Sequence, residues 1–286
     1  MSDDLFDFGE RVDRYAVMGN PIEHSRSPRI HSLFAEQTGQ AIEYTAIQVD
    51  IGGFRQAVGN FSASGAKGLN ITVPFKEEAW ALVNDRSPRA EQAGAVNTIK
   101  IEGNQSYGDN TDGIGLVNDL QNNLSYELRD KRILIMGAGG AARGIIAPIL
   151  EQQPELMVIA NRTPDKAAAL ASHFGELGKV QGGGYGQLAG LRFDIVLNAT
   201  AASLKGEVPD LPEDLLADNA LCYDLMYGAK PTAFLAWAAD HDASQISDGL
   251  GMLVEQAAES FYIWRGVRPD TQPVIQAIRY DLNSSE

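Results

Sequence analysis

Residues 132–142, Arg132-Ile-Leu-Ile-Met-Gly-Ala-Gly-Gly-Ala-Ala142, decide the fold of this 286-residue chain. An apolar run suited to a buried strand leads directly into a hexad of the form G-x-G-x-x-A, and a helical pattern follows it. In such a unit the first glycine makes the tight turn, the second lets the backbone approach a pyrophosphate, and the small last residue lets helix and strand pack closely. The stretch therefore predicts a dinucleotide site at Gly137, Ala138, Gly139, Gly140 and Ala141.

The alternation of strand-like runs and amphipathic helices continues along the whole chain, which is typical of an α/β protein with mainly parallel sheets. Before the hexad, strands are expected at Tyr15–Met18, Ile42–Val49, Gly68–Thr72 and Ala95–Ile101, then a Gly/Asn loop and a helix from Asp112 to about Leu124. After the hexad, strands are expected at Leu156–Ala160, Asp194–Leu197, Leu221–Leu225 and Gln245–Ser247.

The polar stretch Gln121–Lys131 is the best candidate for a domain boundary. We therefore expect an N-terminal α/β domain over residues 1–120 and a dinucleotide-binding domain over residues 121–248. The helices predicted from about residue 249 to residue 286 follow a complete nucleotide-binding set, so we expect them to return to the first domain.

Composition excludes several classes of partner. The formal net charge is −15, and so acidic a surface repels nucleic acid and anionic membranes. The N-terminus lacks the apolar core of a signal peptide, and no run approaches the ~18 apolar residues of a membrane span. The only cysteine, Cys222, lies in an apolar stretch and is expected to be a buried small hydrophobe in a cytoplasmic protein. Four scattered histidines have no metal-site spacing, so no metal is predicted.

The residues after the second strand of the nucleotide-binding unit indicate which dinucleotide is bound. Enzymes that use NAD usually carry an acid there for the ribose 2′-hydroxyl. Here Ala160 is followed by Asn161, Arg162 and Thr163, and the first acid, Asp165, lies in the next helix. A guanidinium binds a 2′-phosphate well, and Lys166 adds a second cation, which favours NADP. The alternative is that these residues form a solvated helix cap opened by Thr163.

Asn70-Ile-Thr-Val-Pro-Phe-Lys76 places polar groups at the end of a strand and a lysine at the start of a helix. Asn70 and Thr72 are two residues apart and share a face of the strand. Pro74 suits the first helical position, so Lys76 falls in the first turn, where the helix dipole favours release of its proton. A surface lysine without a chemical role is the alternative.

Two further clusters lie beside helix starts. Asp112 could cap the helix that follows it, or it could act in acid–base chemistry. Ser25 and Ser27 precede another helix, with Pro28 at its first position, and two hydroxyls beside a helix N-terminus can hold a carboxylate with neutral donors. Such a site would allow an acidic protein to bind an anionic ligand. The alternative is that one serine caps the helix and the other has no role.

Taken together, these clusters resemble the shikimate dehydrogenase family. The matching stretches are His24–Pro28, Asn70–Lys76, Gly94–Thr98, Asn110–Gly113, Gly137–Ala142, Asn161–Thr163, Asn198–Thr200, Tyr223–Tyr227 and Gly249–Gln256, in the order of the family. The resemblance covers about residues 14 to 265. It implies an NADP-dependent reduction of 3-dehydroshikimate to shikimate, in a substrate domain that faces a Rossmann domain across a cleft. The sequence departs from the family pattern at one point: Thr200 is followed by Ala-Ala-Ser-Leu, where members of the family often have Ser and a Gly-Met pair.

The resemblance also implies a role for individual residues. Lys76 and Asp112 would form the catalytic pair. Ser25 and Ser27 would hold the substrate carboxylate with Tyr227 nearby, and ring hydroxyls would contact Asn70, Thr72, Asn97 and Gln256. The cofactor would contact Thr200, Leu225, Gly249 and Met252, in addition to Asn161, Arg162, Thr163 and Lys166.

Three alternatives remain at this stage. The first is a quinate/shikimate dehydrogenase of broader specificity that uses NAD; relatives that accept quinate tend to carry threonine in place of Ser27. The second is a sensor that binds the ligands without catalysis, and the third is a paralogue that acts on a different ring acid. The sequence is compatible with a monomer or a homodimer.

Overall fold

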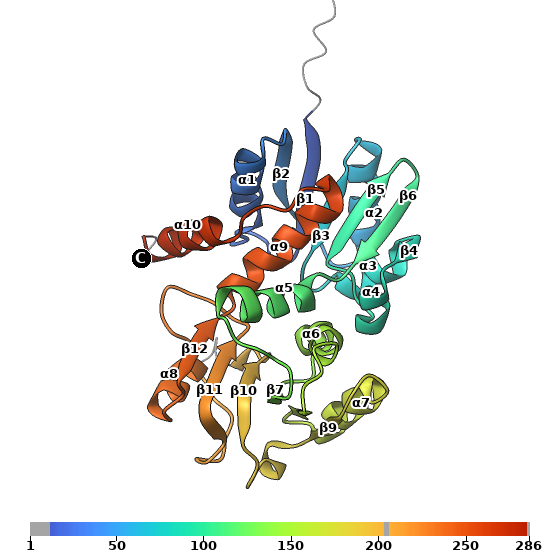
Figure 1. Ribbon diagram of the computed structural model, residues 1–286. Coiled ribbons are helices and arrows are strands. Elements are labelled where there is room, and N and C mark those ends of the chain that lie inside the picture. Colours follow the sequence, from blue (N-terminus) through green and yellow to red (C-terminus); the bar gives the residue numbers. More distant parts are fainter. Residues whose placement is uncertain (1–11, 203–205, 285–286) are drawn as a thin grey trace, which may run out of the picture.

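The computed structural model describes residues 12–202 and 206–284. Residues 1–11 and 285–286, the two ends of the expected N-terminal domain with its returning C-terminal helices, lie outside the described residues. Ser203 and Leu204 of the unusual loop also lie outside them. The described chain forms two six-stranded sheets that are covered by helices (Figure 1). The α/β fold expected from the sequence is confirmed.

The first sheet has the strand order β2-β1-β3-β5-β6-β4. Its strands are β1 (Asp13–Gly19), β2 (Ile42–Gln48), β3 (Gly68–Ile71), β4 (Asp85–Arg86), β5 (Thr98–Glu102) and β6 (Gln105–Asp109). Strands β2 and β3 run parallel to β1, whereas β5 and β6 form an antiparallel hairpin. The associated helices are α1 (Ser27–Thr38), α2 (Phe54–Ala63), α3 (Lys76–Leu82), α4 (Pro88–Ala93) and α5 (Asp112–Asn118).

Two local predictions in this half were wrong. The loop expected after Ile101 contains strand β6, whose polar and glycine residues lack an apolar alternation but pair with β5 through the backbone. Pro74 does not begin a helix: it lies in a turn, the Val73–Pro74 peptide bond is cis, and α3 begins at Lys76. Lys76 nevertheless lies in the first helical turn, as expected.

The second sheet is parallel throughout and has the order β12-β11-β10-β7-β8-β9. Its strands are β7 (Arg132–Met136), β8 (Leu156–Ala160), β9 (Val180–Gly183), β10 (Phe193–Asn198), β11 (Leu216–Asp224) and β12 (Gln245–Asp248). The helices of this half are α6 (Gly140–Leu150), α7 (Pro164–Phe174) and α8 (Ala233–Asp240), with a short 3-10 turn, η2 (Tyr185–Gln187). Counted from β7, the order is the 3-2-1-4-5-6 of a Rossmann fold, which binds ligands where the strand order reverses.

Gly137 lies at that reversal, between the ends of β7 and β10. Its φ is 107°, a left-handed conformation that favours glycine. A Cβ added there would lie 3.0 Å from the carbonyl oxygen of Ala199. The first glycine of the hexad is therefore required both by its backbone conformation and by its surroundings.

The C-terminal helices α9 (Leu250–Arg265) and α10 (Gln272–Asn283) share a hydrophobic core with α1 of the N-terminal half. Their shared core includes Phe34, Val254 and Phe261. Farther along α9, the ring of Trp264 stacks on Tyr15 at 4.6 Å. The last part of the chain thus returns to the N-terminal half, and α9 runs between the two sheets (Figure 1).

Helix α5 was expected to continue to about Leu124, but it changes after Asn118 into a π-helical turn, η1 (Asp119–Asn123). The wider turn allows the buried carboxylate of Asp119 to accept a hydrogen bond from the hydroxyl of Tyr223, at 2.7 Å. Among residues 12–202 and 206–284, no helix is long and apolar enough to cross a membrane, and no group of three or more metal-ligating side chains was found.

The contact between β3 and α9 generates a prediction about stability. A Cβ at Gly68 would lie 2.4 Å from Nε1 of Trp264 and 2.8 Å from the carbonyl oxygen of Ile99. Gly68→Ala should therefore lower the free energy of unfolding by ~1–3 kcal/mol, the usual cost of overpacking a core. Gly59→Ala is the matched control, because Gly59 lies in α2 with open space around it, and alanine should raise stability by ~0.5–1 kcal/mol. Denaturant unfolding measures both effects, and equal stabilities of the two variants would contradict the packing described.

Burial of His31 generates a second prediction. Its ring is fully buried and stacks on Tyr44 at 4.2 Å, and burial lowers the pKa of His31 to about 3. In the unfolded chain the pKa is ~6.5, so the unfolded state binds the extra proton between those values. The stability that depends on neutral His31 is therefore complete above pH ~6.5 and is lost as the pH falls towards 3.

His31→Phe should consequently flatten the decline in the free energy of unfolding between pH 7 and pH 4 in urea titrations. The exposed His173 provides the control, and His173→Gln should keep the slope of the unmodified protein. Parallel pH profiles for the His31 variant and the unmodified protein would show that His31 is not buried in its neutral form.

Candidate active site

A cavity of about 360 Å³ lies between the two halves, at the carboxyl ends of β1 and β3. Every substrate-binding and catalytic residue expected from the sequence lines it. They are Ser25, Ser27, Asn70, Thr72, Lys76, Asn97, Asp112, Tyr227 and Gln256. Three of the expected cofactor residues, Leu225, Gly249 and Met252, line the same cavity from the side of the second sheet. The cavity can thus hold a small polar molecule against the end of a bound dinucleotide.

Lys76 and Asp112 form an ion pair in this cavity. The Nζ of Lys76 donates a hydrogen bond to Oδ2 of Asp112 at 2.5 Å, although the two residues lie 36 positions apart. Both side chains are largely buried, with 27% and 13% of their surface exposed. An ammonium carries three N–H donors, so the lysine can bind a ligand oxygen while it remains bonded to the carboxylate. The pair is therefore suited to acid–base chemistry.

Asp112 occupies the first position of α5 rather than the capping position, which Thr111 takes. Its carboxylate does not cap the helix, because its two oxygens are used by side chains. Oδ2 accepts from Lys76, and Oδ1 accepts from Nδ2 of Asn97 at 2.8 Å. The capping interpretation of Asp112 is therefore wrong, and the side chain is held towards the cavity instead.

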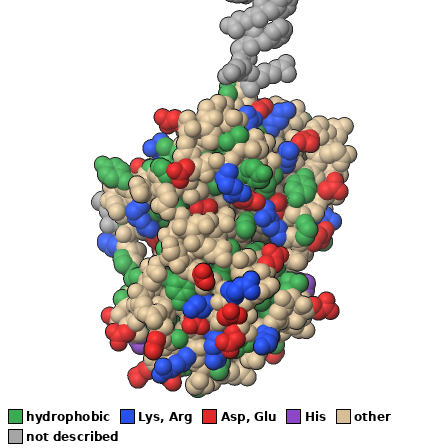
Figure 2. Space-filling view, in the orientation of Figure 1, with side chains coloured by type: hydrophobic (Ala, Val, Ile, Leu, Met, Phe, Trp, Pro, Cys, Tyr) green, Lys and Arg blue, Asp and Glu red, His purple; other side chains and the backbone are tan. Residues whose placement is uncertain are grey.

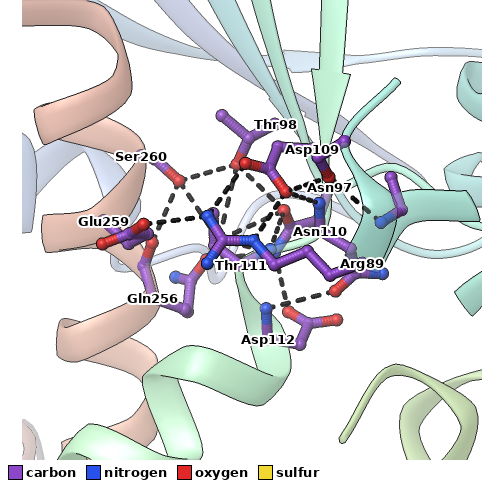
Figure 3. Close-up of polar contacts among 12 residues, drawn as sticks. Arg89, Asn97, Thr98, Asp109, Asn110, Thr111, Asp112, Gln256, Glu259 and Ser260 are labelled. Carbon is purple, nitrogen blue, oxygen red and sulfur yellow. Dashed lines mark hydrogen bonds and ion pairs between the residues drawn. The ribbon is translucent and has the colours of Figure 1, made fainter. Parts of the chain in front are cut away.

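Asn97 and Asn70 line the cavity, but most of their polar atoms already have protein partners (Figure 3 shows the network around Asn97). The oxygen of Asn97 accepts from the backbone N–H of Thr111 at 2.9 Å. The amide nitrogen of Asn70 donates to Ser260 at 3.0 Å, and its oxygen accepts from the hydroxyl of Tyr44 at 2.7 Å. Because its N–H groups point inward, Asn70 meets a ligand mainly as a hydrogen-bond acceptor.

Ser25 and Ser27 lie at the start of α1, and both line the cavity. The hydroxyl of Ser25 accepts a hydrogen bond from the backbone N–H of Ser27 at 3.3 Å. The helix begins at Ser27, so Pro28 is the second helical residue rather than the first. Tyr227 lines the same cavity, and burial raises the pKa of its hydroxyl, so it remains a neutral donor.

The local charge of the cavity differs from the charge of the whole protein. Its lining includes the cations Arg26 and Lys76 and one carboxylate, Asp112. Outside the cavity, acidic and basic side chains are interspersed on the face shown in Figure 2. Two cations against one carboxylate give this lining a charge of 2 − 1 = +1, although the net charge of the whole chain is −15.

The cofactor residues lie along the carboxyl ends of the second sheet. A Cβ added to Gly139 would meet no protein atom within 4 Å, so the backbone at the start of α6 is open to a ligand. A second cavity of about 510 Å³ is lined by Asn161, Arg162 and Thr200. Thr163 and Lys166 are exposed beside it at the start of α7 but do not line it. These positions fit a dinucleotide whose pyrophosphate lies at the N-terminus of α6.

The Asn198–Thr200 motif has a structural explanation. The oxygen of Asn198 accepts from the backbone N–H and the hydroxyl of Thr200, at 3.1 and 2.8 Å. Its amide nitrogen donates at 3.1 Å to Asp224, which is fully buried at the end of β11. Asn198 therefore fixes the loop after β10 relative to β11. Thr200, in this loop, lines the second cavity together with Asn161 and Arg162.

Sequence analysis missed residues that act at the edge of the site. Arg26, between the two serines, lines the cavity, and the sequence pattern predicts no role for it. Tyr44, on β2, was not singled out because a tyrosine in a strand is ordinary core composition. Its contact with Asn70 depends on how β2 and β3 are placed beside β1, and no local pattern signals it.

Comparison with known families gives matches along most of the chain. Residues 17–99 match the shikimate dehydrogenase substrate binding domain, and residues 119–205 match the model described as shikimate / quinate 5-dehydrogenase. Residues 249–279 match the shikimate 5′-dehydrogenase C-terminal domain.

Individual relatives agree with these matches. The shikimate dehydrogenase (NADP(+)) of Alkalilimnicola ehrlichii is 58% identical over 94% of this chain and 99% of its own length. Among solved structures, an Ael1 enzyme from Pseudomonas putida is 47% identical with a TM-score of 0.87, covering 93% of this chain and 97% of the other. Shikimate 5-dehydrogenase from Thermus thermophilus, solved with NADP(H) and shikimate, is 30% identical with a TM-score of 0.83, covering 94% and 99%.

Proposed function

The chain belongs to the shikimate dehydrogenase family, and we propose that it catalyses the reversible reduction of 3-dehydroshikimate to shikimate with NADPH. One observation carries the proposal. One cavity is lined by the Lys76–Asp112 ion pair, by two serines at the start of α1 and by the amides of Asn70 and Gln256. Leu225, Gly249 and Met252 line the same cavity from the cofactor side. A small ring that bears a carboxylate, hydroxyls and a ketone satisfies each of these groups.

The reduction needs a proton at the ketone oxygen. When bound, NADPH supplies the hydride for the ketone carbon, and the developing alkoxide then requires both positive charge and a proton. The ammonium of Lys76 provides both through one N–H bond directed into the cavity. Asp112 holds the lysine by the hydrogen bond at 2.5 Å, and the two act as one acid–base unit.

Substrate orientation follows from the other side chains. Ser25 and Ser27 hold the carboxylate with neutral donors, and Arg26 and Tyr227 add charge and a further hydroxyl. The ring hydroxyls lie between Asn70, Thr72, Asn97 and Gln256. Because the oxygen of Asn70 accepts and its N–H groups are used internally, it orients one hydroxyl as a donor.

NADP fits the second half of the molecule better than NAD does. The pyrophosphate would lie at Gly137–Ala141, with the nicotinamide end between Leu225, Gly249 and Met252. Arg162, with Asn161, Thr163 and Lys166, would bind the 2′-phosphate. The described residues place no carboxylate directly after β8, where an NAD enzyme usually carries one.

The alternatives are less well supported. A sensor without catalytic activity would not need the buried Lys76–Asp112 pair, and a dehydrogenase with NAD preference would not need Arg162 after β8. We propose that the protein works in the cytoplasm on small molecules alone, without nucleic acid, membrane or metal, as a monomer or a homodimer.

A steady-state assay of the purified protein tests the proposal directly, with shikimate and quinate as substrates and NADP and NAD as cofactors. We expect kcat/KM for shikimate with NADP to exceed that for quinate by well over tenfold, because the extra hydroxyl of quinate would be buried without a partner at ~1–3 kcal/mol. Comparable turnover of shikimate and quinate would support the broader enzyme instead.

Lys76 is the residue whose removal should slow the chemical step most directly. Lys76→Ala should lower kcat at least ~10²-fold, the contribution of one positioned acid–base group, with little change in the KM of shikimate. Lys67→Ala, at an exposed lysine just before β3, is the control and should retain the normal kcat. A near-normal kcat for the Lys76 variant would remove this residue from the mechanism.

Arg162 is expected to decide cofactor preference. Arg162→Ala should weaken NADP binding by ~1.5–3 kcal/mol, the worth of a lost charge-assisted hydrogen bond, and leave NAD binding almost unchanged. Arg192→Ala, at an exposed arginine before β10, should change neither affinity. Titration of each cofactor by fluorescence or calorimetry measures both values. Equal losses for the two cofactors would mean that the 2′-phosphate is bound elsewhere.

A further inference from the structure

The turn that leads to Asp112 begins at Asp109, which forms a buried ion pair with Arg89 (Figure 3). Asp109, at the end of β6, is 3% exposed. Arg89 on α4 binds it in a bidentate manner, with Nε and Nη2 each 2.8 Å from a carboxylate oxygen. The hydroxyl of Ser87 and the backbone N–H of Asn110 donate to the same carboxylate at 2.5 and 2.7 Å. Asp109 is therefore fixed in both position and orientation.

Arg89 is fixed in turn by helix α9. Its Nη2 also donates to Oε1 of Glu259 at 2.8 Å, and the other oxygen of Glu259 binds Arg268. Burial by itself would lower the pKa of Arg89, but hydrogen bonds and charge from Asp109 and Glu259 raise it. One guanidinium thus connects β6 with α9, two elements that lie far apart in the sequence.

Asp109 and Asp112 are joined by a short turn whose polar groups form hydrogen bonds with the surrounding chain. Asn110 donates from its side chain to the carbonyl oxygen of Ala95 at 3.1 Å, and its side-chain oxygen accepts from the backbone N–H of Asp112 at 3.2 Å. The backbone N–H of Thr111 donates to Asn97 at 2.9 Å. These contacts fix the backbone of the turn from Asp109 to Asp112, which are only three residues apart.

A buried ion pair is a poor way to gain stability, because apolar residues of similar volume usually stabilise a fold as well or better. What the bidentate pair does provide is orientation, since the planar guanidinium permits one arrangement of the carboxylate. A fixed orientation is useful at Asp109, because Asp109 lies three residues before Asp112 of the proposed acid–base pair.

We propose that Arg89 is a positioning residue, which acts through Asp109 to hold Asp112 beside Lys76. It does not touch the substrate, and its effect reaches the reaction only through the turn at residues 109–112. The proposal rests on the proposed function, because it takes Lys76 and Asp112 as the acid–base pair.

Two substitutions separate geometry from charge. Arg89→Lys keeps the charge and loses the bidentate contact, and Arg89→Met keeps an unbranched apolar stem and loses both the charge and the contact. Each should lower kcat roughly 10–100-fold, the cost of misplacing a catalytic group by about 1 Å, while the KM values of shikimate and NADP change less than about threefold. Arg268→Met is the matched control, because this arginine binds the same Glu259 but is 46% exposed and does not contact Asp109. It should retain the normal kcat.

Chemical rescue supplies a readout that a purely structural role would not affect. Arg89 lines a surface cavity of about 570 Å³ with Asn118, Glu255 and Thr271, so a small cation can reach the space left by Arg89→Ala. Methylguanidinium should restore kcat of this variant in a saturable manner, whereas sodium chloride at the same ionic strength should not. Lys76→Ala should not respond to methylguanidinium.

The outcomes distinguish this proposal from the proposed function. If the unmodified protein does not oxidise shikimate with NADP, the proposed function fails, and the positioning role fails with it. If the unmodified protein is active and both Arg89→Lys and Arg89→Met keep normal kcat, only the positioning role is overturned. It is also overturned if kcat falls only in proportion to a lowered Tm and methylguanidinium restores nothing.

Discussion

The close packing of helix α9 is the constraint on which the rest of the site depends. Two glycines permit it. A Cβ at Gly115 of α5 would lie 2.7 Å from the backbone nitrogen of Gln256, and a Cβ at Gly251 would lie 1.9 Å from the carboxylate of Asp119. Because interiors are close-packed, a side chain at either position would push α9 away from α5. The same helix brings Gln256, Glu259 and the cofactor-facing Met252 to the site.

Polar groups around the cavity are mostly satisfied by one another before any ligand binds. Asn97 contacts Asp112 and Thr111, and Asn70 contacts Tyr44 and Ser260. Buried networks of this kind restrict each amide to one orientation, because any other orientation would leave a buried donor or acceptor unpaired. The side chains are thus arranged in advance, and binding does not have to order them.

Much of the fold was predictable because its signals are local. The apolar strands of the second half are buried on both faces, so runs such as Ile133–Met136 stand out in the sequence, and the glycine hexad marks the turn after them. Strand β6, Gln105–Asp109, was missed because its residues are polar and small and its stability comes from pairing with β5. The start of α3 was misplaced because Pro74 lies in a turn, and proline suits a turn as well as the first position of a helix.

The sequence by itself determined the fold class, the cofactor half and the family, because the glycine turn, the strand runs and the ordered motifs are properties of neighbouring residues. Only the tertiary structure decided which distant groups meet. Lys76 binds Asp112 across 36 positions, and Arg89 binds Glu259 across 170. Those contacts depend on the crossing of α5 and α9 and on strand order, which are set by the packing of whole elements and not by spacing along the chain.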